Sequence, residues 1–261
     1  MTIRLIKRHV IKLSLALFYL LSSESVLAIN AYVLAADEAS GNTIVDSLTV
    51  FQIDAQLGVS PSVWDGSQID LEEIDVVILL SRDEDTPLMP TTGQQAIIDF
   101  VNNGGGLITG GLAGTRIRKY DDYELLQSLF PFIAWATVSG NGARYFVETS
   151  NGTLQQDLVA DVVFQFAEPG IELYEELEGS IVYYRHQTPG LDSNQAGLVG
   201  WEYGEGQVLS FNTKFLPFEL ENSLDLTTLL RNAVTFAANE ITEEELCMPI
   251  KANAGIAIIC L

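Results

Sequence analysis

Apolar strand segments that alternate with helical segments constrain this fold more than any other feature of the sequence. Residues 31–36, 75–80 and 107–109 are short, almost wholly apolar runs, typical of parallel sheets that are covered on both faces. Residues 44–57 and 92–102 carry apolar side chains at helical spacing. Strands separated by single helices predict right-handed βαβ units, and therefore an α/β fold with a doubly wound sheet.

The remaining segments are less regular. Residues 59–64 are interpreted as a further strand, and residues 123–130 as a helix. The middle third, residues 132–200, contains β-rich runs that predict an antiparallel elaboration or a mixed extension of the sheet. A strand at 207–211 and an amphipathic helix at 225–238 complete the predicted domain.

The first 28 residues are interpreted as a secretory signal peptide. Basic residues at positions 4, 7, 8 and 12 precede an apolar run, and Val26 and Ala28 suit cleavage before Ile29. The run is short for a permanent membrane span, and an uncleaved anchor is the alternative. The sequence therefore predicts a bacterial protein that is exported to the periplasm or out of the cell.

The charge of the chain limits its partners. The formal net charge is −22, and four of the 13 basic residues lie in the predicted signal peptide. Such a field repels nucleic acid and anionic membrane surfaces, so neither is expected as a partner. The acidity serves solubility, or it offers a face to cations or to a basic partner. A small molecule or another protein is the expected ligand.

Two cysteines, Cys247 and Cys260, flank a turn-like stretch at the end of the chain. The apolar segments between them predict a β-hairpin that brings the two thiols opposite each other. In an oxidising compartment this pair is expected to form a disulfide; a metal pair or two free buried thiols are the alternatives. The chain then divides into a signal peptide (1–28), one domain (29–240) and a disulfide-closed hairpin tail (241–261).

A glycine-rich turn has the spacing of a nucleophile elbow. In the segment Gly110-Gly111-Leu112-Ala113-Gly114, which follows a predicted strand, Leu112 occupies the central position. Leucine has no nucleophilic or ionisable atom, so covalent acyl chemistry at this position is excluded. The turn also lacks a P-loop lysine and the first glycine of the dinucleotide-binding pattern, and no cofactor is expected.

The order of these segments resembles the class I glutamine amidotransferase-like superfamily, and especially its trehalose-utilisation-type branch. The resemblance extends over residues 31–240 and is most specific at the helix-to-glycine phrase 97–107 and the closing phrase 204–211. It implies a flavodoxin-like three-layer sandwich with a mostly parallel sheet. Active members place a cysteine where this chain has Leu112, and a histidine near its Asn212. The resemblance therefore implies a member without catalytic residues.

Other side chains offer weaker candidates. His186 is the only histidine after the signal peptide and is expected to be a surface or packing residue rather than a catalytic one. Asp37, Asp83 and Asp85 follow predicted strands at the carboxyl edge of the sheet, where α/β proteins bind ligands. They are interpreted as solvated acidic loops, with a divalent-cation site as the alternative. Arg116 belongs to a basic cluster that could receive an anionic group or neutralise neighbouring acids.

These observations lead to one expectation and two alternatives. We expect an exported, catalytically inactive amidotransferase-like domain that binds a small molecule or a protein. The first alternative is a carbohydrate-related enzyme or hydrolase that uses carboxylates, with or without a divalent metal, at the same sheet edge. The second is a structural protein that docks through its C-terminal hairpin. The candidate ligand-binding residues are Asp37, Asp83, Asp85, Leu112, Arg116 and Asn212.

Overall fold

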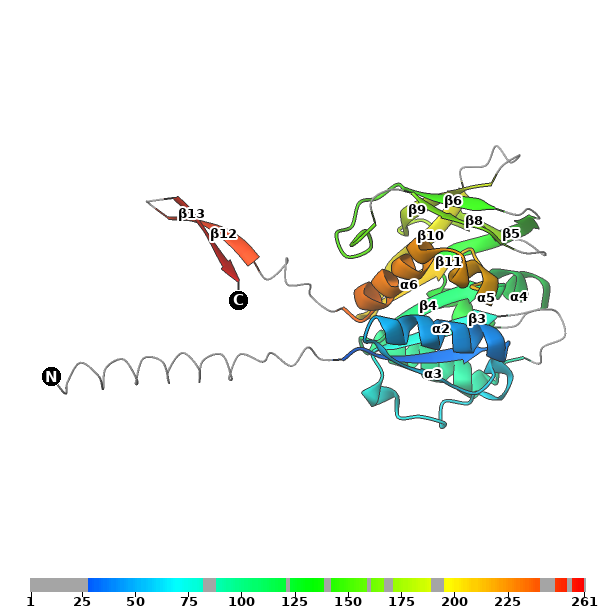
Figure 1. Ribbon diagram of the computed structural model, residues 1–261. Coiled ribbons are helices and arrows are strands. Elements are labelled where there is room, and N and C mark those ends of the chain that lie inside the picture. The colour runs from blue at the N-terminus through cyan, green and yellow to red at the C-terminus, as the bar shows by residue number, and fades with distance from the viewer. Residues whose placement is uncertain are drawn as a thin grey trace, which may run out of the picture.

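A single mixed sheet organises the domain (Figure 1). The structure is a computed structural model. It describes residues 28–81, 88–120, 123–138, 142–158, 161–166, 171–188 and 195–239, and the backbone of 247–252 and 255–260. The described strands of the domain form an 11-stranded sheet. Residues 1–27 of the predicted signal peptide lie outside the described residues. In the part of the chain so described, no helix is long and apolar enough to span a membrane.

One half of the sheet is parallel, as predicted. Its strands occur in the order β2-β1-β3-β4-β11 and consist almost entirely of buried residues, except for the edge strand β2. Their bounds are β1 Asn30–Ala35, β2 Asp54–Leu57, β3 Val76–Ser81, β4 Gly106–Gly111 and β11 Gly206–Phe211. All four neighbouring pairs run parallel. This arrangement aligns the carboxyl ends of the strands at one edge of the sheet.

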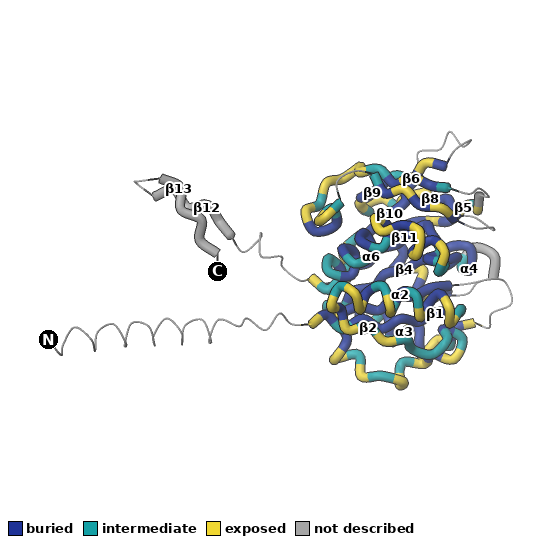
Figure 2. Tube along the Cα trace, in the orientation of Figure 1, coloured by how far each residue is buried: buried dark blue, intermediate teal, exposed yellow. Residues whose placement is uncertain are grey.

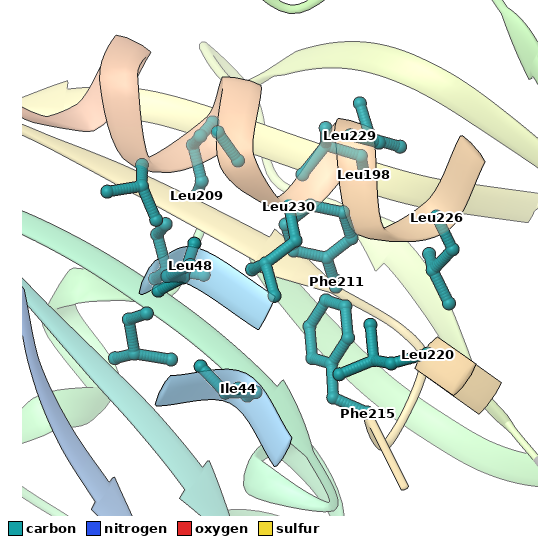
Figure 3. Close-up of a cluster of buried hydrophobic side chains, with 14 of the residues drawn as sticks. Ile44, Leu48, Leu198, Leu209, Phe211, Phe215, Leu220, Leu226, Leu229 and Leu230 are labelled. Carbon is teal, nitrogen blue, oxygen red and sulfur yellow. The ribbon is translucent and has the colours of Figure 1, made fainter. Parts of the chain in front are cut away.

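Helices cover both faces of this sheet and produce three layers. Alternate residues of β1 enter different core clusters: Ala31 and Val33 face one layer, while Tyr32 and Leu34 face the other. The helices are α2 (Glu38–Val50), α3 (Thr91–Asn102), α4 (Ala113–Tyr120), α5 (Pro217–Glu221) and α6 (Leu224–Ala237). Figure 3 shows the first layer, in which side chains of α2, α5 and α6 meet Phe211 of β11. Burial is continuous through the centre of the domain (Figure 2).

The middle of the chain extends the sheet with antiparallel strands, in agreement with the predicted β-rich insertion. The sheet continues from β11 through β10, β9 and β6 to β7. A branch leaves β10 through β8 and ends at β5. The bounds are β5 Phe132–Val138, β6 Ala143–Val147, β7 Val162–Phe164, β8 Ile171–Glu176, β9 Ile181–Gln187 and β10 Gln195–Tyr203.

Two predicted boundaries in the first half are wrong. The helix predicted over 44–57 ends at Val50, because Gln52 adopts a left-handed conformation with φ of 64° and turns the chain. The following strand is therefore Asp54–Leu57, and the strand predicted over 59–64 is instead a loop with a 3₁₀ turn, η1 (Pro61–Val63).

The segment predicted as a helix over 123–130 is also shorter than expected. It is irregular except for one 3₁₀ turn, η3 (Leu126–Leu129), which buries Leu126 and Leu129 against the second core layer. A second 3₁₀ turn, η2 (Leu71–Glu73), leads into β3. The apolar spacing of residues 123–130 thus reflects core contacts rather than an α-helix.

The C-terminal hairpin has the predicted pairing. Strands β12 (Cys247–Ala252) and β13 (Gly255–Cys260) form a separate antiparallel pair, and the register places Cys247 directly opposite Cys260. Only the backbone is described here, so the disulfide between the two cysteines stays a prediction.

Candidate functional site

The candidate site is built around the strand-turn-helix elbow at the carboxyl end of β4. Strand β4 ends at Gly111, Leu112 makes the turn, and α4 begins at Ala113. The left-handed conformation falls on Gly111, with φ of 78°, and not on Leu112. The elbow predicted from the glycine spacing is therefore present, but its left-handed residue precedes the central position and is a glycine, which adopts this conformation without strain.

Close backbone packing explains the glycines of this turn. A Cβ atom on Gly111 would lie 2.1 Å from the backbone oxygen of Ser81 on the neighbouring strand β3. A Cβ atom on Gly114 would lie 2.4 Å from the Cβ of Ala134 on β5. Both glycines are thus required because the elbow packs against two strands without room for a side chain.

Leu112 and Asn212, the two positions that the sequence resemblance singles out, are both buried. Leu112 is only 6% exposed. Asn212 is fully buried; its Oδ1 accepts a hydrogen bond from the Tyr145 hydroxyl (2.6 Å), and its Nδ2 donates to the Glu172 carbonyl (3.0 Å). The Asn212 backbone nitrogen donates to Gly197 and its carbonyl accepts from the Glu172 nitrogen. Asn212 therefore joins β6, β8 and β10 to the end of β11.

The N-terminus of the elbow helix is engaged by a buried carboxylate of the same chain. Glu172 projects from β8, is fully buried, and its Oε1 atom accepts a hydrogen bond from the Thr115 backbone nitrogen at 2.5 Å. Its Oε2 atom has no hydrogen-bond partner among the described residues. Burial raises the pKa of Glu172, and hydrogen bonds from the first turn of α4 oppose this shift. A carboxylate is stabilised at this end of a helix by the free amides and the helix dipole.

A second buried carboxyl group lies on the other side of the elbow. Glu219 on α5 accepts hydrogen bonds from the Thr213 hydroxyl (2.8 Å) and the Leu216 backbone nitrogen (3.0 Å). Burial raises its pKa to about 7, although these hydrogen bonds act in the opposite direction. Thr213 in turn accepts a backbone hydrogen bond from Gly111 at 2.9 Å, which ties Glu219 to the elbow.

His186 packs in the core, which excludes the surface position left open by the sequence. It is fully buried on β9, where its Nε2 atom lies 2.5 Å from the Thr188 hydroxyl and its ring meets Tyr145 edge-on. Burial lowers its pKa to about 4, so the ring is neutral at physiological pH. No group of three or more potential metal ligands occurs among the described residues.

The other predicted site residues are only partly brought together. Leu112, Arg116 and Asn212 lie around the elbow, and all three are buried, so they do not form an open surface. Asp37 caps α2 by accepting hydrogen bonds from the backbone and hydroxyl of Ser40. Asp83 and Asp85 lie outside the described residues. The acidic cation site that would need these three aspartates stays a prediction.

A groove opens beside the elbow. It has a volume of about 260 Å³ and runs between α4, the η3 segment and the edge strand β5. Gly114 of the elbow helix is one of its lining residues, and Glu124 and Gln127 supply its polar lining. Its apolar lining consists of Ile117, Phe130, Phe132, Ile133 and Ala134. A ligand in this groove would therefore touch the elbow helix without reaching a nucleophile.

The sequence interpretation missed Glu172 and Glu219. A usable signal exists for Glu172, because it stands between Ile171 and Leu173 in a strand whose first four residues are all buried. Because side chains alternate between the two faces of a strand, Glu172 would have been placed on one face of an apolar strand, where a charged residue needs a partner. Glu219 follows Pro217 by two residues, the spacing of an acid that caps a helix start, which is a weaker signal.

Comparison with solved structures identifies the fold. A protein from Parabacteroides merdae described as ThuA-like matches with a TM-score of 0.59 and 13% identity, covering 89% of this chain and 98% of its own. A protein from Thermoplasma acidophilum, described as one of the subunits of GMP synthase, matches with 0.54 and 10%, covering 81% and 95%. A β-galactosidase from Bacillus circulans matches with 0.55 and 14%, covering 85% of this chain and 32% of its own.

These likenesses confirm the expected flavodoxin-like α/β fold, which ThuA-like proteins share. No protein-family profile matches the chain, and no curated protein does. At these low identities, the neighbours describe the architecture and not the chemistry of the elbow.

Proposed function

We propose that this chain is an exported, catalytically inactive amidotransferase-like domain that binds a small molecule or a protein partner. The observation that carries the proposal is the hydrogen bond from the Thr115 backbone nitrogen to the Glu172 carboxylate. Export is supported by the basic and apolar pattern of the first 28 residues.

The physical reason concerns charge at the elbow. Acyl transfer develops a negative oxygen, which active sites stabilise with unoccupied amide donors. In this chain the Thr115 amide in the first turn of the elbow helix already donates to the Glu172 carboxyl group, so this amide is not available to a ligand. Leu112 supplies no nucleophile and Asn212 supplies no base, so two requirements for acyl transfer are unmet.

The groove beside the elbow is the proposed binding site. It is lined by apolar and aromatic residues, of which Phe130 and Phe132 are buried, together with Glu124 and Gln127. Such a combination of an apolar lining with a few polar groups is typical of ligand sites. Gly114 belongs to the elbow helix and also lines the groove, so the elbow forms part of the proposed binding surface.

A carbohydrate-related enzyme or hydrolase is the second candidate. It is favoured by Glu219, because a carboxyl group with a pKa of about 7 suits a general acid. One structural neighbour is a β-galactosidase. Against it, Glu172 and Glu219 are both fully buried, and neither borders the groove.

Turnover by the purified protein separates the two candidates. We expect no hydrolysis of glutamine, p-nitrophenyl acetate or p-nitrophenyl glycosides by the wild-type chain. Leu112→Cys should be equally inactive, because its buried thiol would have no histidine base. Turnover that disappears in Glu172→Gln or Glu219→Gln, but persists in Glu175→Gln, would overturn the proposal. Glu175 is a suitable control because it is exposed on the same strand as Glu172.

A further inference from the structure

Strand β5 is an unprotected edge of the sheet. Among the described strands it pairs only with β8, so one side of its backbone has no partner strand. Its sequence, Phe-Ile-Ala-Trp-Ala-Thr-Val, contains no charged residue and no proline. Natural proteins usually protect edge strands with lysine, proline or a bulge, and here only a register shift between Ala134 and Ala136 serves that role. In Figure 1, β5 lies at the margin of the fold.

Two large apolar side chains project from this edge. Ile133 is 50% exposed and Trp135 is 49% exposed. The alternate residues of the strand, Phe132 and Ala134, are buried. The Trp135 indole donates a 3.4 Å hydrogen bond to Gln195, which orients the ring on the surface. Ile133 also lines the groove that runs to Gly114. Ile133 therefore belongs both to the exposed pair and to the groove lining, and we call the pair and the groove together the β5 surface.

Acidic side chains surround the β5 surface. Glu124 lines the groove, and the exposed Glu175 is paired across the strands with Ile133. Glu178 is also exposed and follows Leu177, whose nitrogen donates to the carbonyl of Pro131 at the start of β5. Among the described residues that line the groove, none is basic. A complementary partner would combine apolar side chains with positive charge.

We propose that the β5 surface binds an extended segment of another protein in which apolar and basic side chains alternate. The segment adds a strand to β5, and its alternate side chains lie on the two faces of the sheet. The apolar side chains lie beside Ile133 and Trp135, and the basic side chains lie on the face of the groove, where Glu124 is found. Backbone pairing at a sheet edge supplies affinity, and side-chain pockets supply selectivity. A second copy of this chain is disfavoured because each copy carries a net charge of −22. The inference rests on the proposed binding function and names the class of partner.

The test measures binding of a labelled peptide, Lys-Ile-Lys-Ile-Lys-Ile-Lys-amide, to the full chain by fluorescence anisotropy. We expect saturable binding of this peptide. A control peptide of the same composition, with its lysines and isoleucines in separate blocks, should bind about tenfold more weakly, because it cannot place the two kinds of side chain on opposite faces of a strand. Ile133→Lys/Trp135→Lys should also weaken binding by about tenfold. Val50→Lys/Leu224→Lys is the matched control, because these residues are 79% and 74% exposed elsewhere and the change in net charge is identical.

A second pair of variants protects the test against misfolding. Glu124→Gln/Glu175→Gln changes only exposed side chains, and it should weaken binding about threefold or more and reduce its salt dependence. The inference is overturned if the peptide does not saturate, or if both lysine double variants lose affinity equally. It is also overturned if light scattering shows a dimer that Ile133→Lys/Trp135→Lys dissociates. None of these results depends on turnover. The binding test can therefore fail while the proposed lack of catalysis holds, and the reverse is also true.

Discussion

The Oε1 atom of Glu172 lies 2.5 Å from the backbone nitrogen of Thr115, so a strand of the antiparallel half caps the helix that follows the elbow. The two residues are 57 positions apart in the chain. This contact connects the part of the fold shared with parallel α/β domains to the β-rich insertion. It also occupies one of the amides in the first turn of the elbow helix that would otherwise have no partner within the helix.

The conformation of Gly111 leads to a prediction about stability. Gly111→Ala should destabilise the protein by about 3 kcal/mol or more, because it combines an unfavourable positive φ with a clash against the Ser81 carbonyl. Gly179→Ala is the matched control: its φ is 90°, but no atom of the described residues lies within 4 Å of the new Cβ. This control should lose only about 1 kcal/mol, the cost of the left-handed conformation. Urea unfolding measures both, and equal losses would contradict the role of the clash.

The raised pKa of Glu219 predicts a pH-dependent stability. Because its folded pKa is about 7 and its usual value is 4.5, Glu219 favours the folded state most below pH 4.5. This contribution is lost as the pH rises through 7. The free energy of unfolding of the wild type, relative to Glu219→Gln, should therefore fall by about 3 kcal/mol between pH 4.5 and pH 8.

Urea unfolding across this pH range measures the effect of Glu219. Glu221→Gln, which removes an exposed carboxyl group from the same helix, controls for the loss of one charge. A difference between wild type and Glu219→Gln that stays constant from pH 4.5 to pH 8 would show that Glu219 titrates normally.

The register of the C-terminal hairpin predicts a cross-strand disulfide. Cys247 and Cys260 are directly opposite each other in the β12–β13 pair. Thiol titration in denaturant of the protein purified without reductant from an oxidising compartment should detect no free thiol before reduction and two per chain afterwards. Two free thiols before reduction would contradict the prediction. A bound metal ion released by denaturation would instead favour the metal-pair alternative.

The parallel half of the fold was predictable because its sequence signals are local. Strands such as β3 are buried on both faces, so an apolar run was enough to identify them. The end of α2 was not predictable, because a left-handed glutamine, Gln52, performs the role that usually falls to glycine.

The candidate site was predictable only in part. The glycine spacing indicated the elbow and its unreactive Leu112. The partner of the elbow amide was missed, because Glu172 reaches Thr115 through the pairing of strands distant in sequence. In the sequence, Asn212 was notable only because it lies near the position where active members of the resembled family have a histidine. The structure shows that Asn212 joins three other strands.

The central claim is that the Glu172 carboxyl group occupies the Thr115 amide at the start of the elbow helix. The most direct test is whether added acetate can replace this group in a variant that lacks it. Glu172→Ala removes a group equivalent to acetate and leaves the Thr115 amide buried without a partner. The variant should lose about 3 kcal/mol of stability at pH 7, as expected for a buried cavity and an unpaired donor. Sodium acetate should then restore part of the melting temperature, whereas sodium chloride at the same ionic strength should not.

Glu175→Ala, on the exposed part of the same strand, should show no specific response to acetate. The account predicts rescue in Glu172→Ala alone. A Glu172→Ala variant as stable as the wild type, or one that acetate stabilises no more than it stabilises Glu175→Ala, would contradict the claim that Glu172 occupies the elbow.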